Sequence, residues 1–143
     1  MQELGRRWRL LAEGAGIAGL LCAHVLTRAY DHVVLVERDL LPDAPVHRPG
    51  VPQSRHVHGL LDRGLRDIEH LVPGFTTDLL QHGAGLVDFA ADIALRTPAG
   101  WLPRVPSCLR SCTASRPLVE TAIRRRVLSH ARSSCTSATW PTA

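Results

Sequence analysis

The sequence predicts an α/β fold built around a parallel sheet, and three observations near its N-terminus support this. Three glycines, Gly14, Gly16 and Gly19, follow a short, partly apolar segment. The apolar residues after them recur at helical spacing. Residues 33–36 then form an unbroken aliphatic run, which is typical of a strand buried on both faces of a parallel sheet. Strand, glycine turn, helix and strand in this order make a βαβ unit.

The elements of this unit have separate justifications. Residues 9–12 are a short and poor candidate for the first strand. The helix is expected over residues 17–28, where apolar side chains repeat on one face, and residues 30–32 break the pattern. The second strand ends at Glu37, directly after its aliphatic run.

The remainder of the chain predicts further helices and strands. Four prolines between residues 42 and 52 predict a long loop. The pattern then predicts helices at about 58–71 and 76–81, one or two strands within 85–97, a strand within 107–115 and a helix that Pro117 opens.

The last helix is expected to be amphipathic. Its inward side chains would be aliphatic, namely Leu118, Val119, Ala122, Ile123 and Val127. Glu120, Arg124 and Arg125 would point outward, and the triplet 124–126 is interpreted as the solvent-facing side of the helix. We expect one domain over residues 1–130 and a disordered tail over 131–143, where all periodicity is lost.

Composition argues against several classes of protein. All 17 basic side chains other than histidine are arginines, and the formal net charge is +4. These arginines form no continuous basic stripe, and aromatic residues make up only 4% of the 143 residues. Both facts disfavour nucleic-acid binding, which uses basic grooves and stacking aromatic side chains.

The lack of a recognisable targeting signal and the spacing of the cysteines predict a cytoplasmic protein. Arginines precede the apolar residues 10–26, but Glu13 interrupts that stretch and no A-x-A cleavage site follows it, so a secretory signal is disfavoured. No apolar run is long enough to span a membrane. The four cysteines, Cys22, Cys108, Cys112 and Cys135, have no metal-site or disulfide-framework spacing and are expected to be free thiols. Cys108 and Cys112 are expected to lie in a buried strand.

The glycine pattern indicates a site for a nucleotide diphosphate. In a Rossmann-type unit the first glycine makes a tight turn, the second lets the backbone approach the pyrophosphate, and the third lets helix and sheet pack closely. Gly14, Ala15 and Gly16 would therefore present backbone amides to phosphate at a helix N-terminus. Glu37 lies where such folds place a ribose-binding acid. The alternative is that the glycines only begin a helix and that Glu37 only ends a strand.

Glu37 also discriminates between nucleotides. A carboxylate at this position repels a 2′-phosphate, so NADP is disfavoured as the bound dinucleotide. NAD, FAD and other ligands with an adenosine ribose all stay open on this argument. His56 and His58 form an HxH pair, but no further metal ligand is placed near them, and we expect no metal site.

Two longer segments resemble FAD-dependent oxidoreductases related to the flavin monooxygenases. The first is "VLVERDLLPDAPVHRPGVPQSRHVHGLLDRGLRDIEHLVPG" at residues 34–74, which is similar to members with an "ERD" strand end and a "GVPQxRHxHxLL" segment. The second is "ASRPLVETAIRRRV" at 114–127, which resembles the helix that returns to the flavin in that family.

The resemblance implies roles for individual residues. Gly14, Gly16 and Gly19 would bind the FAD pyrophosphate, and Glu37 would bind the adenosine ribose. It further implies that Arg38 lies on the adenine side and that Arg116 contacts the inner part of the cofactor. No catalytic residue is assigned.

The resemblance also implies a function for a longer protein. The chain would be the N-terminal FAD-binding portion of an oxidoreductase, a monooxygenase that acts on a small organic substrate with NADH or NADPH as electron donor in full-length members. Because family members are more than twice as long, the Rossmann-type fold is expected to be incomplete and the chain truncated. The alternatives are a noncatalytic remnant that folds with a complementing chain, and an NAD-binding module.

Overall fold

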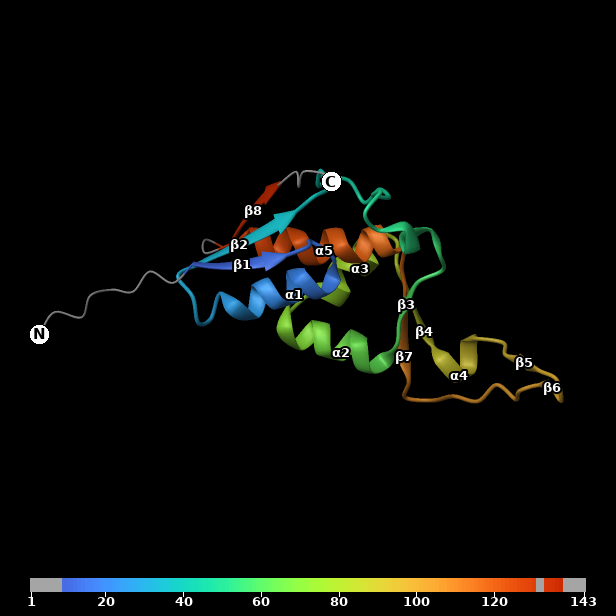
Figure 1. The fold of residues 1–143 in the computed structure, drawn as a ribbon. Coiled ribbons are helices and arrows are strands. Elements are labelled where there is room, and N and C mark those ends of the chain that lie inside the picture. The colour runs from blue at the N-terminus through green and yellow to red at the C-terminus, as the bar shows by residue number, and fades with distance from the viewer. Residues whose placement is uncertain (1–8, 131–132, 138–143) are drawn as a thin grey trace, which may run out of the picture.

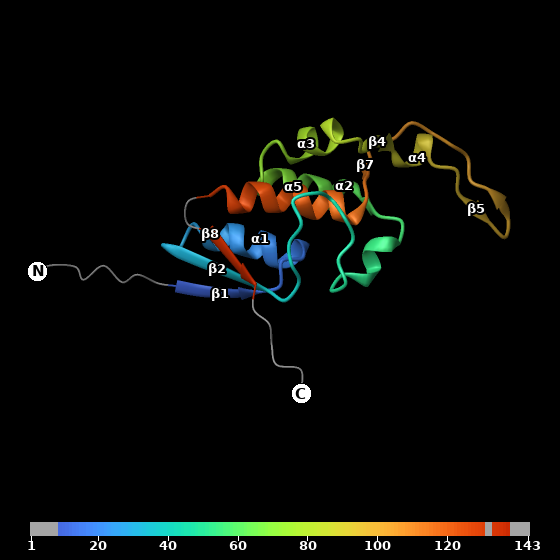
Figure 2. The same ribbon diagram turned by 90° about the horizontal axis from the view of Figure 1, so that it is seen from above.

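The computed structural model describes residues 9–130 and 133–137, and it confirms the predicted α/β class. Three strands, β1 (Arg9–Glu13), β2 (His32–Glu37) and β8 (Ser133–Ser137), form a parallel sheet in the order β1-β2-β8. Helices α1 (Ile17–Leu26) and α5 (Arg116–Leu128) pack side by side against one face of this sheet (Figure 1). The second view shows the same layering from above (Figure 2).

The fold is more mixed than a single parallel sheet. A second sheet is antiparallel, in the order β3-β7-β4, and a two-stranded hairpin projects from the body beyond it (Figure 1). These strands are β3 (Gly59–Leu60), β4 (Gly85–Asp88), β7 (Arg110–Thr113), β5 (Arg96–Thr97) and β6 (Gly100–Trp101). Strands β4, β5 and β7 fall within segments predicted as strands, whereas β3 and β6 were not predicted, and neither was the antiparallel sheet.

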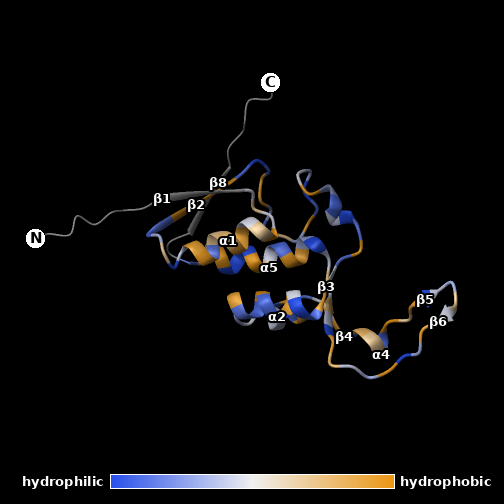
Figure 3. Cartoon of the chain, turned by 60° about the horizontal axis from the view of Figure 1, so that its bottom comes forward, coloured by the Kyte–Doolittle hydropathy of each residue, from blue (hydrophilic) through white to orange (hydrophobic). Residues whose placement is uncertain are grey.

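Strand β2 forms because its aliphatic side chains fill the core, although the prediction of burial on both faces is only half right. Val33 and Leu35 are each 1% exposed and pack with Leu20 and Ala23 of α1. Val34 and Val36, on the other face, are only partly buried. The hydropathy colouring shows the apolar character of α1, whereas α2 (Asp62–Leu71) mixes polar and apolar residues (Figure 3).

Helix α5 corrects part of the sequence analysis. Ser115 caps it by accepting a hydrogen bond from the Leu118 amide, and four aliphatic side chains enter the core: Val119, Ala122, Ile123 and Val127. Glu120 and Arg124, predicted to face outward, are only 4% and 7% exposed. They are buried because the proline-rich loop crosses this part of the helix, where Arg124 donates a hydrogen bond to the carbonyl of Pro42.

Three other predictions need correction. The helix expected from residue 58 begins at Asp62, after the short strand β3. Within 85–97, helix α4 (Phe89–Asp92) interrupts the expected strands, because the Asp88 carboxylate accepts the amide hydrogens of Ala90 and Ala91 and caps a helical turn. In the expected disordered tail, residues 133–137 pair with β2 as β8; their polar sequence has no alternating pattern that could indicate a strand. The rest of 131–143 lies outside the described residues.

The turn between α2 and α3 (Phe75–Gln81) is held by charged groups. The Glu69 carboxylate accepts the amide hydrogens of Gly74 and Thr76 at 2.6 and 2.8 Å. Arg126 donates to the carbonyls of Pro73 and Gly74, so it is engaged with the body and does not belong to a solvent-facing triplet. Burial raises the pKa of Glu69, but these amide donors and Arg126 outweigh it and lower the pKa overall.

We expect Glu69→Gln to lower the free energy of unfolding by roughly 1–2 kcal/mol, because hydrogen bonds to a charged acceptor are stronger than those to a neutral amide. Urea denaturation at pH 7 measures this loss. Since the pKa of Glu69 is lowered by folding, its contribution is present above the ordinary glutamate pKa and is lost as the pH falls through the folded value. A loss that stayed constant down to pH 3 would contradict this assignment.

Among the described residues, no helix is both long enough and apolar enough to cross a membrane.

Candidate functional site

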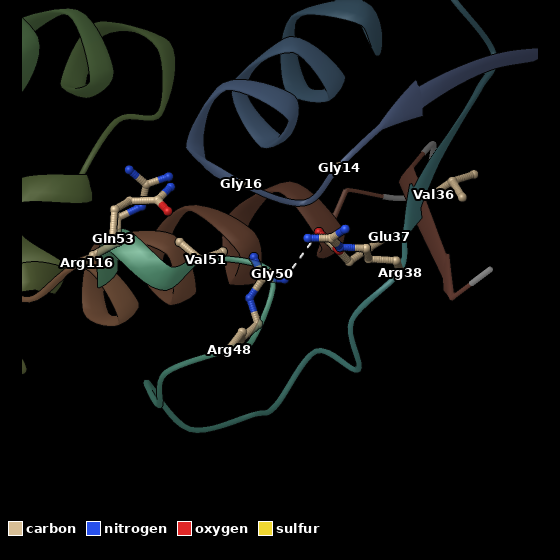
Figure 4. A pocket seen from close by; sticks show the side chains of 10 residues that line it. All are labelled: Gly14, Gly16, Val36, Glu37, Arg38, Arg48, Gly50, Val51, Gln53 and Arg116. Carbon is tan, nitrogen blue, oxygen red and sulfur yellow. Dashed lines mark ion pairs between the residues drawn. The ribbon is translucent and has the colours of Figure 1, made fainter. Parts of the chain in front are cut away.

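A cavity of about 370 Å³ opens at the carboxyl ends of β1 and β2, in front of the N-terminus of α1 (Figure 4). Clefts at this edge of a parallel sheet are where open α/β folds bind ligands. The glycine turn, the end of β2, the loop before η1 (Pro52–Arg55) and the start of α5 all contribute to its wall. The lining residues are Gly14, Gly16, Val36, Glu37, Arg38, Arg48, Gly50, Val51, Gln53 and Arg116.

The glycine turn has the backbone geometry that the sequence predicts. Gly14 has a φ of 84°, in the left-handed region that favours glycine, and its amide donates to the carbonyl of Val36 at 2.7 Å. Gly16 is the N-cap residue of α1 and provides no side-chain cap, and the first turn of the helix contains no acidic residue. The first amides of the helix therefore have no capping side chain and add their partial positive charge to the cavity.

Glu37 lies directly against this turn. Its Oε2 accepts the amide hydrogen of Ala15 at 2.6 Å, and its Oε1 accepts that of Asp39 at 3.0 Å. Burial raises the pKa of the carboxyl, but the two amide donors and the guanidinium of Arg48 outweigh burial and lower the pKa. Glu37 is therefore a fixed carboxylate at physiological pH, and it is next to the glycines, as the βαβ interpretation requires.

Arg48 is a site residue that the sequence analysis did not identify. Its side chain is 4% exposed, and its Nη1 lies 3.2 Å from carboxylate oxygens of both Glu37 and Asp39. Its Nη2 donates to Glu120 at 3.0 Å and to the carbonyl of Ala15 at 3.3 Å. Figure 4 shows its ion pair with Glu37 as a dashed line. Arg48 thus joins the glycine turn, the end of β2, the proline-rich loop and α5.

Arg116 and Arg38 both line the cavity, from different elements. Arg116 is the first residue of α5, and its Nε lies 2.6 Å from Oε1 of Glu120. A Cβ added to Gly16 would lie 3.7 Å from the Nη2 of Arg116, so this arginine directly faces the glycine turn. Arg38 follows β2 and is exposed.

The structure therefore brings together most of the residues singled out in the sequence. Gly14, Gly16, Glu37, Arg38 and Arg116 line one cavity. The amides of Gly14 and Ala15, expected to point at phosphate, instead donate to the Val36 carbonyl and to Glu37. Gly19 is the third residue of α1, within its first turn.

Gly50, like Arg48, belongs to the proline-rich loop and was not identified as a site residue in the sequence analysis. Its amide donates to Asp39 at 2.8 Å, and a Cβ on Gly50 would collide with that carboxylate. The closely spaced glycine and prolines there signalled only a loop.

Other candidate groups stay apart. The Nδ1 of His58 is 2.8 Å from the carbonyl of His56, and in the part of the chain that the structure describes no group of three or more potential metal ligands occurs. Cys112 is buried in β7 as expected, whereas Cys108 and Cys22 are exposed. Cys135 lies outside the residues whose side chains are described.

The sequence of the chain was compared with protein families and with curated proteins. No family model matches the chain. Over 119 residues it is 40% identical to Protein Rv3254 of Mycobacterium tuberculosis (strain ATCC 25618 / H37Rv), a match that covers 80% of this chain and 25% of the relative. The chain therefore spans about a quarter of the length of that curated relative.

Solved structures match over most of the chain. A tetrameric form of 2-methyl-3-hydroxypyridine-5-carboxylic acid oxygenase superposes with a TM-score of 0.63 at 22% identity, over 92% of this chain and 32% of that protein. This chain shares its fold with part of that oxygenase.

A second protein, PqsL of P. aeruginosa, matches similarly. A mutant form has a TM-score of 0.65 at 16% identity, and the complex with 2-aminobenzoylacetate has a TM-score of 0.62 at 14% identity. Each match covers 90% of this chain and 32% of PqsL. At these identities the likeness concerns the fold alone.

Proposed function

We propose that this chain is the FAD-binding portion of an FAD-dependent oxidoreductase, a monooxygenase that oxidises a small organic molecule. The β1-α1-β2 segment would act as a Rossmann-type unit that binds the ADP half of the dinucleotide. The observation that carries the proposal is the cavity in which the glycine turn, Glu37 and Arg116 meet. The shared fold with an oxygenase and the sequence resemblance to flavin monooxygenases support it.

The groups around the cavity fit such a ligand chemically. Two guanidinium groups, from Arg38 and Arg116, and the uncapped first turn of α1 provide donors and positive charge for a diphosphate. Glu37 is the one carboxylate among the lining residues. Its Oε2 is engaged with the Ala15 amide and with Arg48, whereas Oε1 accepts only the Asp39 amide hydrogen and keeps a second acceptor site for a ribose hydroxyl.

Each predicted residue then has a binding role. The backbone of Gly14, Ala15 and Gly16 would approach the pyrophosphate, and Gly19 would allow α1 to pack closely on the sheet. Arg38 would lie beside the adenine, and Arg116 would contact the inner part of the cofactor. When bound, FAD would supply the redox and oxygen-transfer chemistry, while these residues hold and orient it.

Titration of the purified chain with FAD, followed by flavin fluorescence, tests the proposal. We expect saturable binding that ADP competes away, and weaker competition by 2′-phospho-ADP because Glu37 repels its extra phosphate. A chain that binds neither FAD nor ADP would disprove the proposal. Binding of NADH in preference to FAD would instead indicate an NAD-binding module.

Glu37→Gln is expected to weaken ADP binding by about 1–3 kcal/mol, because a hydrogen bond to a charged acceptor becomes one to a neutral amide. Isothermal titration calorimetry measures the change. Asp67→Asn is the matched control, since it also neutralises one carboxylate but on the exposed side of α2, where Asp67 pairs with Arg63. Equal affinities of the two variants would remove Glu37 from the site.

A further inference from the structure

We propose that Glu120 is a positioning residue that orients Arg116 toward a bound diphosphate while it holds Arg48 in the wall of the cavity. The inference rests on the proposed nucleotide site and adds to it a residue that does not line the cavity. Glu120 is 4% exposed in the middle of α5, one turn after Arg116. Its two carboxylate oxygens serve different arginines, with Oε1 at 2.6 Å from Nε of Arg116 and Oε2 at 3.0 Å from Nη2 of Arg48.

The arrangement leaves useful donors on Arg116, whereas the terminal nitrogens of Arg48 are engaged with protein acceptors. The pair with Glu120 uses the Nε of Arg116, so that the two terminal amino groups of this arginine stay outside the pair. One of these, Nη2, faces Gly16. Arg48 is held from the other side by Glu37 and Asp39, so that its guanidinium is fixed at the wall of the cavity. Both cationic groups are thereby ordered before a ligand arrives.

This ordering has an energetic consequence for binding. An arginine side chain that is already immobilised loses little further entropy when it contacts a phosphate, so affinity increases. Glu120 also partly neutralises the two cations, an effect that by itself would weaken attraction for an anion. Because the hydrogen bonds are short and the group is buried, we expect the ordering effect to be the larger.

A carboxylate with only a structural role would behave differently. Its removal would destabilise α5 and the proline-rich loop, and it would weaken every nucleotide by a similar factor. A positioning role predicts a selective loss, because the oriented Arg116 would act on the phosphates. The ratio of ADP affinity to AMP affinity therefore separates the two roles.

The experiment compares ADP and AMP binding to the full chain and to Glu120→Gln, Glu120→Asp and Glu69→Gln by calorimetry, with thermal melting of each. Glu120→Gln keeps the shape of the side chain and removes its charge. Glu69→Gln is the matched control, because it removes the charge of another carboxylate that accepts two hydrogen bonds and does not line the cavity.

We expect Glu120→Gln to weaken ADP binding about 10-fold or more while AMP binding falls less, so that the ADP to AMP ratio drops. Glu120→Asp, which keeps the charge, should restore part of the ratio. The control should melt at a lower temperature with the ratio unchanged. An unchanged ratio in Glu120→Gln would overturn the inference while leaving the nucleotide site intact. A wild-type chain that binds no ADP would overturn both.

Discussion

Replacing Arg48 with methionine is expected to lower the free energy of unfolding by about 3–5 kcal/mol, the usual cost of removing one partner from a buried ion pair. The substitution leaves the carboxylates of Glu37, Asp39 and Glu120 without their shared cation. Desolvation of a charged group is costly when nothing compensates it. Methionine keeps the unbranched apolar stem of the side chain and lacks the charged end, so the loss of the guanidinium dominates. Urea denaturation at pH 7 measures it.

Arg63→Met provides the control for this measurement. Arg63 also pairs with a carboxylate, that of Asp67, but its side chain is 89% exposed. Exposed ion pairs contribute little, so this variant should unfold close to the wild type. A similar loss in both variants would contradict the assignment of a buried charge cluster around Arg48.

The effect of Arg48→Met should shrink in acid. In the wild type the pKa of Glu37 is lowered, so its stabilising contribution is present above the ordinary glutamate pKa and is lost as the pH falls through the folded value. In the variant, burial of Glu37 is no longer offset by Arg48, so the pKa of Glu37 rises, the carboxyl takes up a proton at higher pH and its desolvation cost disappears. A difference in stability that grew between pH 7 and pH 4 would contradict this account.

Local patterns were sufficient to predict the glycine turn and the elements around it. Gly14, Gly16 and Glu37 act through neighbouring backbone and through the end of a strand that its aliphatic run makes recognisable. The start of α5 was also predictable, because Pro117 and the capping Ser115 are local signals. The helix starts at Asp62 and Phe89 were not predictable. The short strand β3 precedes the first, and the Asp88 cap begins a helical turn at the second, where a strand was expected.

The charge cluster could not be predicted from local patterns. Arg48 and Glu120 are 72 positions apart, and charged residues in a loop and on a helix are normally exposed. The passage of the proline-rich loop over α5 brings the two side chains together, and this contact is tertiary. Glu120 and Arg124 were predicted to face solvent for the same reason, because charged residues on a helix are normally exposed. Buried charges are therefore where the structure adds most to the sequence.

Gly16→Val is expected to reduce FAD and ADP affinity by at least roughly 100-fold, about 2.8 kcal/mol at 1.4 kcal/mol per factor of ten. Gly16 has a φ of −75° and a ψ of 176°, which valine adopts without strain, so folding should be little affected. The added Cβ would instead lie 3.7 Å from Nη2 of Arg116, and its methyl groups would fill the space between that arginine and the first turn of α1.

Gly16→Val distinguishes an effect on ligand binding from an effect on folding, because a bound diphosphate must approach the backbone at Gly16 closely. Calorimetry with ADP and thermal melting of the same samples measure the two effects. Gly64→Ala on α2 is the control, since a Cβ there meets no atom within 4 Å; it should leave binding unchanged and stabilise the helix by up to about 1 kcal/mol. If Gly16→Val melts like the wild type and still binds ADP equally well, the diphosphate does not approach this turn. Its binding site would then have to lie elsewhere on the chain.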